Sequence, residues 1–188
     1  MALLLNDANV GDVVMSSVNQ PMVENLITRW IDTPLGPLEI GVKDKKCYWY
    51  FDFKTQEQLL DLHNTEQHEL LDLAQAHFEE YFAGTRRTFS ELLQHTSDYG
   101  TEFQQACWDT LTHIPYGETW TYGQQAKFMQ KPKSSRAVGA ANGKNPLTIV
   151  VPCHRVIGGN GTLTGYASGL DKKKWLLEFE NPQRNLAI

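Results

Sequence analysis

Short runs of β-branched and aromatic residues fill the first part of the chain and predict extended structure. These runs cover 26–32, 37–42 and 47–53, and turn-forming residues separate them. Farther along, apolar residues recur at helical spacing through 66–83, and Gly84 stands where the helix is expected to end. The pattern predicts a small antiparallel meander that is covered by one helix.

The pattern becomes helical after 94–100, a polar stretch without periodicity. Two capping boxes, each a threonine followed three residues later by a glutamine, predict helix starts at Thr101 and Thr121. After a Lys-Pro break, Ser134 can cap a third helix over 135–142. The last two helices are short and joined by a tight turn, which predicts a helix-turn-helix.

Together these patterns predict an α+β fold in two parts. Residues 22–97 form an N-terminal domain of antiparallel sheet and helix, and residues 98–188 form a mainly helical, winged helix-turn-helix-like domain. Residues 1–21 are interpreted as a loosely held extension, because no Lys or Arg precedes Arg29 and the positive start of a secretory signal is therefore missing. No apolar run reaches the roughly 18 to 20 residues that span a bilayer, so we expect no membrane insertion.

The net charge of −5 is unevenly distributed. Residues 1–98 hold 7 basic and 16 acidic side chains, a balance of −9, whereas residues 99–188 hold 10 and 6, a balance of +4. Such an asymmetry is typical of nucleic-acid contact confined to one region, although two ordinary solvated faces would also produce it. The composition, with 41% hydrophobic and 21% charged residues, is that of a globular protein and excludes wholesale disorder.

The three cysteines, Cys47, Cys107 and Cys153, contain no Cys-x-x-Cys pair. An odd count without such a pair favours a reducing cytoplasm over a disulfide scaffold. Cys107 lies on the apolar face of the helix that starts at Thr101, so we expect it in the core.

Three histidines of the first half, His63, His68 and His77, could in principle gather a metal ion. Lone histidines on a polar helix are more often solvated, and no metal is predicted.

The helix over 135–142 carries small side chains along its length and a single long cation, Arg136. Small side chains allow close approach to a narrow groove. Arg136 could then enter a stack of bases or bind a phosphate, and the alternative is an ordinary exposed arginine.

The apolar run 147–151 predicts a buried strand that ends at Pro152-Cys153-His154-Arg155. The nucleophile of a cysteine is its thiolate, so Cys153 needs an adjacent base or cation, and we expect its sulfur to be deprotonated. Neighbouring residues of a strand point in opposite directions, so a contact between Cys153 and His154 would require a turn or an intervening water. A carboxylate should orient this histidine, and Glu178 and Glu180 are the candidates.

The segment from Pro152 to Ile157 resembles the signature of the O6-alkylguanine-DNA alkyltransferases. Asn145-Pro146 and the run 136–139 precede it, Gly165-Tyr166 and the run 174–177 follow it, and the likeness extends from about 103 to 180. The run 33–38 resembles the family's first domain less specifically. The resemblance implies a ribonuclease-H-like fold for that domain.

The resemblance also implies the roles of several residues. Cys153 would accept an alkyl group from O6 of guanine once and irreversibly, with His154 as a water-mediated base that Glu180 orients. Asn145 would hold the turn that carries the cysteine, and Tyr122 would donate a proton or hydrogen bond to N3 of the leaving guanine.

Further residues would contact the substrate or the DNA. Tyr166 would line the pocket near O6, and Arg136 would fill the gap that an extruded base leaves. The full set implied at this surface is Ser135, Arg136, Ala137, Gly139, Ala140, Val156, Tyr166 and Ala167. The chain departs from relatives at 166–169, which read Tyr-Ala-Ser-Gly in place of Tyr-Ser-Gly-Gly or Tyr-Ala-Gly-Gly.

The implied partner is double-stranded DNA that contains O6-alkylguanine, approached from the minor groove by a cytoplasmic monomer without a cofactor. O4-alkylthymine is a possible second substrate. Three alternatives stay open: a non-catalytic binder of alkylated bases, a cysteine hydrolase, and a helix-turn-helix regulator. The first lacks the motif cysteine that Cys153 supplies, the second needs a histidine downstream of His154, which is the last in the chain, and the third gives no reason for the Pro-Cys-His-Arg motif.

Overall fold

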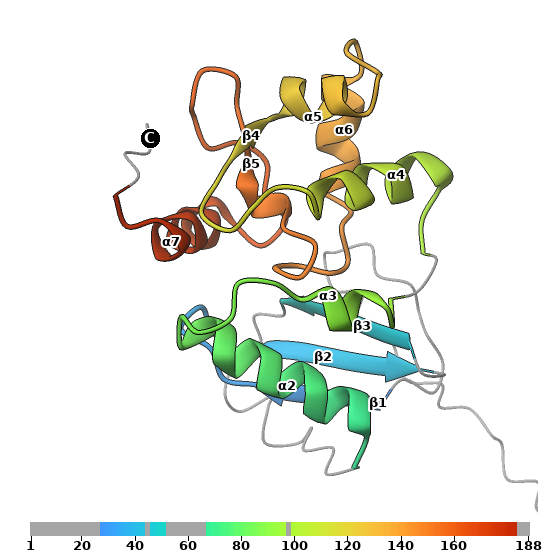
Figure 1. Ribbon diagram of the computed structural model, residues 1–188, viewed down its shortest axis with the longest axis vertical. Coiled ribbons are helices and arrows are strands. Elements are labelled where there is room, and N and C mark those ends of the chain that lie inside the picture. The colour runs from blue at the N-terminus through green and yellow to red at the C-terminus, as the bar shows by residue number, and fades with distance from the viewer. Residues whose placement is uncertain (1–26, 44–45, 52–66, 97–98, 184–188) are drawn as a thin grey trace, which may run out of the picture.

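The computed structural model describes residues 27–43, 46–51, 67–96 and 99–183. The predicted extension at 1–21 and His63 lie outside these ranges. Figure 1 shows two stacked groups of elements. The first contains β1 (Ile27–Ile31), β2 (Leu38–Lys43), β3 (Lys46–Phe51), α2 (Glu69–Phe82) and α3 (Ser90–Leu93).

The sheet of the first group is an antiparallel meander in the order β1-β2-β3, which confirms the prediction. Alternate residues of β2, namely Leu38, Ile40 and Val42, are fully buried. Helix α2 packs on this sheet through a buried stripe that includes Leu71 and Phe78. The period-two pattern of the strand and the helical period of α2 therefore supply the two sides of one core.

Helix α2 ends as predicted, with Gly84 just beyond its last turn at φ +77°, a conformation that favours glycine. The expectation that the histidines of this helix are solvated is wrong for His77, whose side chain is buried and only 3% exposed. Its Nε2 lies 3.3 Å from Glu91 Oε2, and its ring lies beside Phe89 in the space between α2 and α3. Within the described ranges, no cluster of three His, Cys, Asp or Glu residues could hold a metal ion.

The second group is mainly helical and carries a helix-turn-helix, as expected. It contains α4 (Glu102–Leu111), β4 (Trp120–Thr121), α5 (Tyr122–Phe128), α6 (Ser135–Asn142), the 3-10 turn η1 (Cys153–Arg155), β5 (Val156–Ile157) and α7 (Leu170–Glu180). Both predicted capping boxes are present, at Thr101 and Thr121. Ser134 occupies the cap position of α6 without a side-chain cap bond. Strands β4 and β5 form a short parallel pair beside the helices.

Buried amide side chains fix the helices of this group to one another. Gln125 of α5 donates to the carbonyl of Cys107 in α4 at 3.0 Å and exchanges hydrogen bonds with Asn142 of α6 at 2.8 and 3.2 Å. The indole of Trp108 donates to the carbonyl of Ala141 at 2.9 Å. Because each amide is satisfied only when all three helices are in place, these contacts orient α6.

The predicted strand at 147–151 is wrong. Its apolar side chains are buried as expected, but the backbone turns, with Val151 N donating to Leu147 O at 2.8 Å and Ile149 at φ +74°. Asn145 explains the turn, since its side chain accepts from Leu147 N at 3.0 Å and donates to Val151 O at 2.7 Å. The side chain of Asn145 thus supplies partners that a neighbouring strand would otherwise supply.

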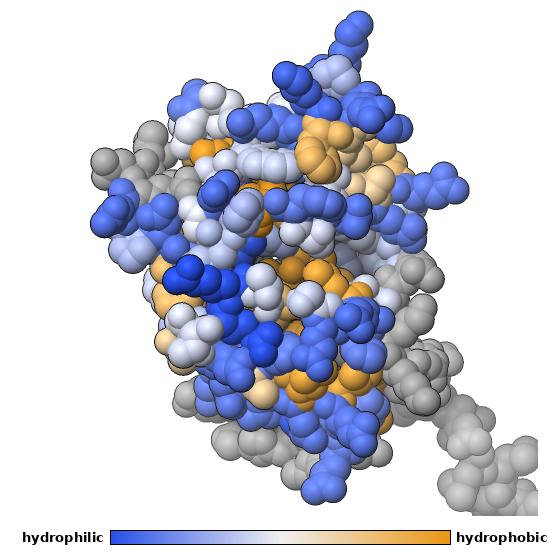
Figure 2. All heavy atoms as spheres, viewed as in Figure 1, coloured by the Kyte–Doolittle hydropathy of each residue, from blue (hydrophilic) through white to orange (hydrophobic). Residues whose placement is uncertain are grey.

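Buried aromatic rings join the two groups of elements. Tyr81 of α2 lies 5.6 Å from Phe179 of α7 and 6.1 Å from Tyr116, measured between ring centroids. Hydrophilic side chains cover most of the face seen in Figure 2, with apolar patches between them. None of the helices among the described residues is long and apolar enough to cross a membrane. The domain division at 97/98 stays a prediction.

Replacing Asn142 with alanine should destabilise the protein by about 1–3 kcal/mol, because the buried amide of Gln125 would lose a partner. Urea unfolding measures the change. The control is Lys144→Ala, an exposed position two residues farther on, which should stay within about 0.5 kcal/mol of the wild type. Equal stabilities of the two variants would contradict the proposed orientation of α6 by these amides.

Candidate active site

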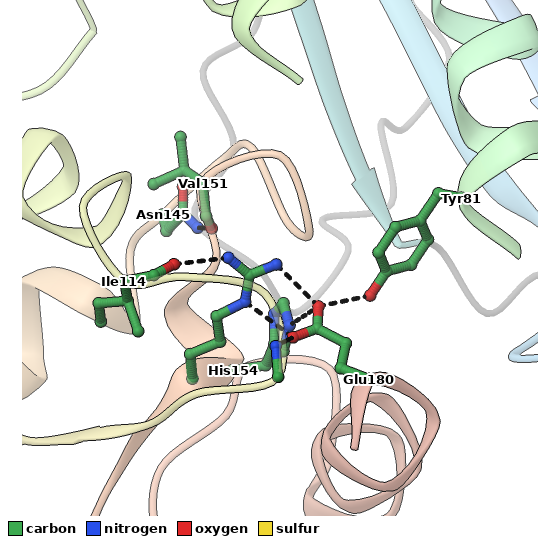
Figure 3. Close-up of polar contacts among 8 residues, drawn as sticks. Tyr81, Ile114, Asn145, Val151, His154 and Glu180 are labelled. Carbon is green, nitrogen blue, oxygen red and sulfur yellow. Dashed lines mark hydrogen bonds and ion pairs between the residues drawn. The ribbon is translucent and has the colours of Figure 1, made fainter. Parts of the chain in front are cut away.

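The carboxylate of Glu180, the last residue of α7, is the centre of the polar contacts (Figure 3). Its Oε1 accepts from Tyr81 Oη at 2.8 Å, His154 Nε2 at 3.0 Å and Arg155 Nη2 at 2.9 Å. Its Oε2 accepts from Arg155 Nε at 2.8 Å and from the backbone N of Gly117 at 3.1 Å. Three separate parts of the chain therefore converge on one side chain with no exposed surface.

Glu178, the other candidate partner of His154, lies on the exposed side of α7. Its carboxylate faces Lys174 at 3.8 Å, one helical turn away, and is 48% exposed. The contacts therefore select Glu180 as the residue that orients His154, in agreement with the role that the family resemblance implies.

Glu180 carries a negative charge at neutral pH. Burial alone would raise the pKa of its carboxyl, but His154 and Arg155 outweigh burial and hold this pKa well below its usual range. The guanidinium of Arg155 also donates to the carbonyl of Ile114 at 2.7 Å and lies 5.7 Å from the ring centroid of Tyr116. The buried charge pair is thus fully hydrogen-bonded, which offsets the cost of burying it.

His154 is fully buried and neutral at rest. Burial lowers the pKa of its imidazole, against the opposing influence of Glu180. Because an ionised carboxylate only accepts hydrogen bonds, the ring proton must be on Nε2, which leaves a lone pair on Nδ1. Nδ1 has no hydrogen-bond partner among the described residues. The ring is therefore held with its basic nitrogen free to accept a proton.

Cys153 begins the 3-10 turn and is 8% exposed. Asn145 Nδ2 donates to its sulfur at 3.2 Å. Burial raises the pKa of the Cys153 thiol, and the hydrogen bond from Asn145 and the charge of Lys173 only partly oppose this effect. The resting sulfur is therefore a thiol, which corrects the expectation of a deprotonated one: desolvation disfavours the thiolate more than its neighbours favour it.

Among the described residues, no direct hydrogen bond joins the His154 ring to the Cys153 sulfur. The two side chains belong to consecutive residues of a 3-10 turn and not to a strand. A water between Nδ1 and the sulfur stays a prediction.

Lys173 is part of the site, and sequence reasoning missed it. Its side chain is fully buried, and Nζ donates to Val156 O at 2.6 Å and to Thr164 O at 2.8 Å. Burial lowers the pKa of Lys173 to about 8, while its interaction with Cys153 works in the opposite direction. Three consecutive lysines at 172–174 suggest a solvated face, and nothing in the local pattern distinguishes the middle one.

Two tyrosines lie near the Cys153 sulfur. Tyr122 donates to Thr164 O at 3.1 Å, and Tyr166 has a buried hydroxyl with no hydrogen-bond partner within the described ranges. Burial, with a contribution from Cys153, raises the pKa of both phenols. Both hydroxyls therefore remain protonated near the thiol, and their roles toward a bound guanine stay predictions.

The exposed face of α6 carries few large side chains. Arg136, Ala137 and Ala140 are exposed and Ser135 is half-buried. Exposed lysines surround this helix and α5, at Lys127, Lys131, Lys133 and Lys144. The positive balance of the second half is thus concentrated around a helix that allows close approach.

The remaining predicted contact residues occupy different surroundings. Gly139 faces Tyr122, and a Cβ at this position would lie 3.4 Å from that ring, so Gly139 makes room for Tyr122. Val156 is fully buried, with its carbonyl bound by Lys173. Ala167 is exposed beside Tyr166. Val156 thus has no exposed surface and Gly139 is half-buried, and their contacts with DNA or substrate stay predictions.

Comparison with known proteins agrees with this geometry. Residues 102–182 match the family model described as 6-O-methylguanine DNA methyltransferase, DNA binding domain. A methylated-DNA–protein-cysteine methyltransferase of Methanosarcina acetivorans is 46% identical over 151 residues, which are 79% of this chain and 94% of the relative. The constitutive methylated-DNA–protein-cysteine methyltransferase of Bacillus subtilis is 46% identical over 156 residues, which are 79% of this chain and 92% of that protein.

Solved structures give the same result. The O6-methylguanine methyltransferase of Mycobacterium tuberculosis superposes with a TM-score of 0.67 at 38% identity, covering 85% of this chain and 95% of that one. The M. tuberculosis protein in complex with DNA superposes with a TM-score of 0.70 at 40% identity, covering 82% and 92%. A mixed α+β fold that buries a Cys-His-Glu arrangement thus defines a cysteine-dependent transferase. The chain belongs to the methylated-DNA–protein-cysteine methyltransferase family.

Replacing Glu180 with glutamine should cost about 3–5 kcal/mol of stability at neutral pH, because the Arg155 charge would lose its buried partner. The folded pKa of Glu180 lies below its unfolded value of about 4.3, so its stabilisation is complete above that pH and is lost as the pH falls. The difference between wild type and variant should therefore shrink on acidification.

Denaturant unfolding at a series of pH values measures this difference. Glu178→Gln, on the exposed side of the same helix, should change stability by less than about 0.5 kcal/mol. A gap between the wild type and Glu180→Gln that stays constant down to acid pH would contradict the assigned charge state.

Proposed function

We propose that the protein repairs DNA by transferring the alkyl group of O6-alkylguanine to the sulfur of Cys153, once per chain. The new bond joins sulfur to the alkyl carbon, and the bond that breaks joins that carbon to O6 of the guanine. The thiol proton passes to His154, and the guanine leaves as an anion that takes up a proton. The observation that carries the proposal is a buried thiol beside a histidine whose basic nitrogen is free.

His154 supplies the base in this reaction. Its Nδ1 lone pair takes the thiol proton through a water, and the resulting imidazolium is stabilised by the Glu180 charge on Nε2. A thiolate that forms only during transfer is strongly nucleophilic, because no solvent shell has to be removed from it. Lys173 and Asn145 stabilise the developing negative charge on sulfur.

The leaving purine needs a donor on the opposite side. Tyr122 stays protonated near the sulfur, and its hydroxyl donates a hydrogen bond to the carbonyl of Thr164. This hydroxyl could turn from that carbonyl toward N3 of a bound guanine. Tyr166 has a buried donor without an assigned partner in the described ranges, as expected for a group that bonds to a substrate near O6. These two hydroxyls are the predicted acid side of the transfer.

A base inside a duplex cannot reach the buried Cys153, so the nucleotide must be extruded at a cost of about a few kcal/mol. The exposed Arg136 at the start of α6 and the small residues beside it support entry through the minor groove, with the guanidinium filling the gap. A complex of the M. tuberculosis relative with DNA supports DNA as the partner. The surrounding lysines predict binding that weakens with salt and tolerates sequence changes.

The chain's own cysteines favour a reducing compartment. Cys107 and Cys153 are both free and buried, which supports the prediction of a cytoplasmic protein.

Incubation with duplex DNA that contains O6-methylguanine should add one methyl group, about 14 Da, to each chain and no more, because the thiol is consumed. Intact-protein and peptide mass spectrometry measure the addition and its position. The Cys107→Ser variant should still be modified, because Cys107 is buried in the core, its pKa is raised by burial to about 11, and it is not the acceptor. The Cys153→Ser variant should not be modified. An unmodified Cys153 would contradict the proposal, and O4-methylthymine DNA tests the second predicted substrate in the same assay.

Arg136→Ala should slow repair of duplex DNA by about tenfold or more while leaving transfer from free O6-benzylguanine nearly unchanged, because a free base needs no extrusion. Single-turnover rates with the two substrates measure the effect. Lys174→Ala removes a similar charge from α7 and should affect neither rate strongly. Equal losses with both substrates would refute the role of Arg136 in base extrusion.

A further inference from the structure

One side chain of the sheet-bearing group reaches the carboxylate that holds His154. Tyr81, in the last turns of α2, donates its hydroxyl to Glu180 Oε1 at 2.8 Å across 99 residues of sequence (Figure 3). We propose that Tyr81 is a positioning residue for the transfer reaction: its hydroxyl fixes the Glu180 carboxylate and limits how strongly that carboxylate holds the proton of His154. The inference rests on the proposed function and adds a residue to it.

The position of the Tyr81 hydroxyl is set by packing. The residue is fully buried, and its ring contacts Phe89, Tyr116 and Phe179, with centroid distances of 5.5, 6.1 and 5.6 Å. These three rings come from different parts of the chain, so the phenol cannot rotate away without disturbing the core.

A position that only filled volume would be satisfied by phenylalanine, since a buried hydroxyl is costly unless it is hydrogen-bonded. The Tyr81 hydroxyl bonds to Glu180, and burial together with the nearby carboxylate raises the pKa of Tyr81 well above its usual value. Tyr81 therefore remains a donor at every pH at which the protein works.

The oxygen that Tyr81 contacts is the one that faces His154. Oε1 of Glu180 accepts from Tyr81 at 2.8 Å and from His154 Nε2 at 3.0 Å, so the two donors share its charge. A donor on a carboxylate oxygen stabilises the ionised form and reduces its pull on other protons. Without the phenol, Glu180 would bind the imidazolium form of His154 more strongly.

Stronger binding of the imidazolium form would reduce the fraction of His154 that is neutral and can act as the base. A His154 that is already protonated cannot take the thiol proton, so transfer would slow on the acid side of the pH profile. The other charged groups that act on His154 are Arg155 on the same turn and Lys173 on α7, and both lower its pKa. Neither of them changes when Tyr81 is replaced, so a shift of the acid limb would report the loss of the phenol.

The experiment uses the full-length Tyr81→Phe variant, which keeps the ring and removes only the hydroxyl. Single-turnover rates are measured from about pH 5.5 to 9 with O6-methylguanine duplex and with free O6-benzylguanine. We expect both rates to fall by about three- to tenfold on the acid side of the profile, where more of His154 is protonated, the acid limb to move to higher pH, and DNA affinity to stay unchanged. A profile superimposable on that of the wild type would overturn the inference.

Tyr116→Phe is the matched control. It removes a hydroxyl from the same aromatic cluster, and no hydrogen bond joins that hydroxyl to Glu180 in the described structure. We expect its pH profile to match that of the wild type. A shift equal to that of Tyr81→Phe would assign the effect to packing and overturn the inference.

A second replacement keeps the test decisive if Tyr81→Phe folds poorly. Incorporation of 3-fluorotyrosine at position 81 preserves shape and strengthens the donor, so the acid limb should move to lower pH, opposite to the effect of phenylalanine. An unmoved limb would contradict the inference. A wild-type protein that takes no alkyl group from either substrate would instead remove the proposed function.

Discussion

The structure depends on a buried negative charge that is fully paired. Glu180 ends α7 and accepts hydrogen bonds from four residues in three other segments: α2, the loop at 117, and the turn with the two residues after Cys153. An unpaired carboxylate at this depth would cost several kcal/mol, so each of these segments must reach its place before the charge is tolerated. The same requirement that completes the fold also holds the imidazole of His154 on the Glu180 carboxylate, and it ties the sheet-bearing group of elements to the residues around Cys153.

Burial also determines how the sulfur is used. A permanently exposed thiolate would react with many electrophiles, whereas the Cys153 thiol is raised in pKa by desolvation and stays protonated at rest. Lys173 and Asn145 reduce the free-energy cost of forming the Cys153 thiolate but do not cancel it. His154 keeps Nδ1 without a partner among the described residues, free to receive the proton. Reactivity thus arises when a substrate is held in place and the proton moves, which suits the proposed single use of Cys153.

Much of the fold could be predicted because its signals are local. The capping boxes at Thr101 and Thr121 contain both partners within four residues, and the alternation in β2 needs no knowledge of the rest of the chain. The strand prediction at 147–151 was wrong because a β-branched, apolar composition is compatible with a buried turn as well as with a buried strand. The hydrogen bonds of the Asn145 side chain stabilise the turn. The buried state of His77 depended on packing against α3, which helical periodicity does not report. Cys153 and His154 could be found from the residues at the end of the apolar run, and the family resemblance selected Glu180 over Glu178. Tyr81 and Lys173 act through contacts that no sequence spacing encodes.

The reaction proposed for this site starts from a neutral His154, held by Glu180, next to a protonated Cys153. Nitrogen-15 NMR of the His154 ring, recorded at neutral pH together with the carbon-13 shift of Cys153 Cβ, measures both protonation states directly. We expect a neutral ring with its proton on Nε2, an unprotonated Nδ1 and a thiol. A ring protonated on both nitrogens beside a thiolate would contradict it.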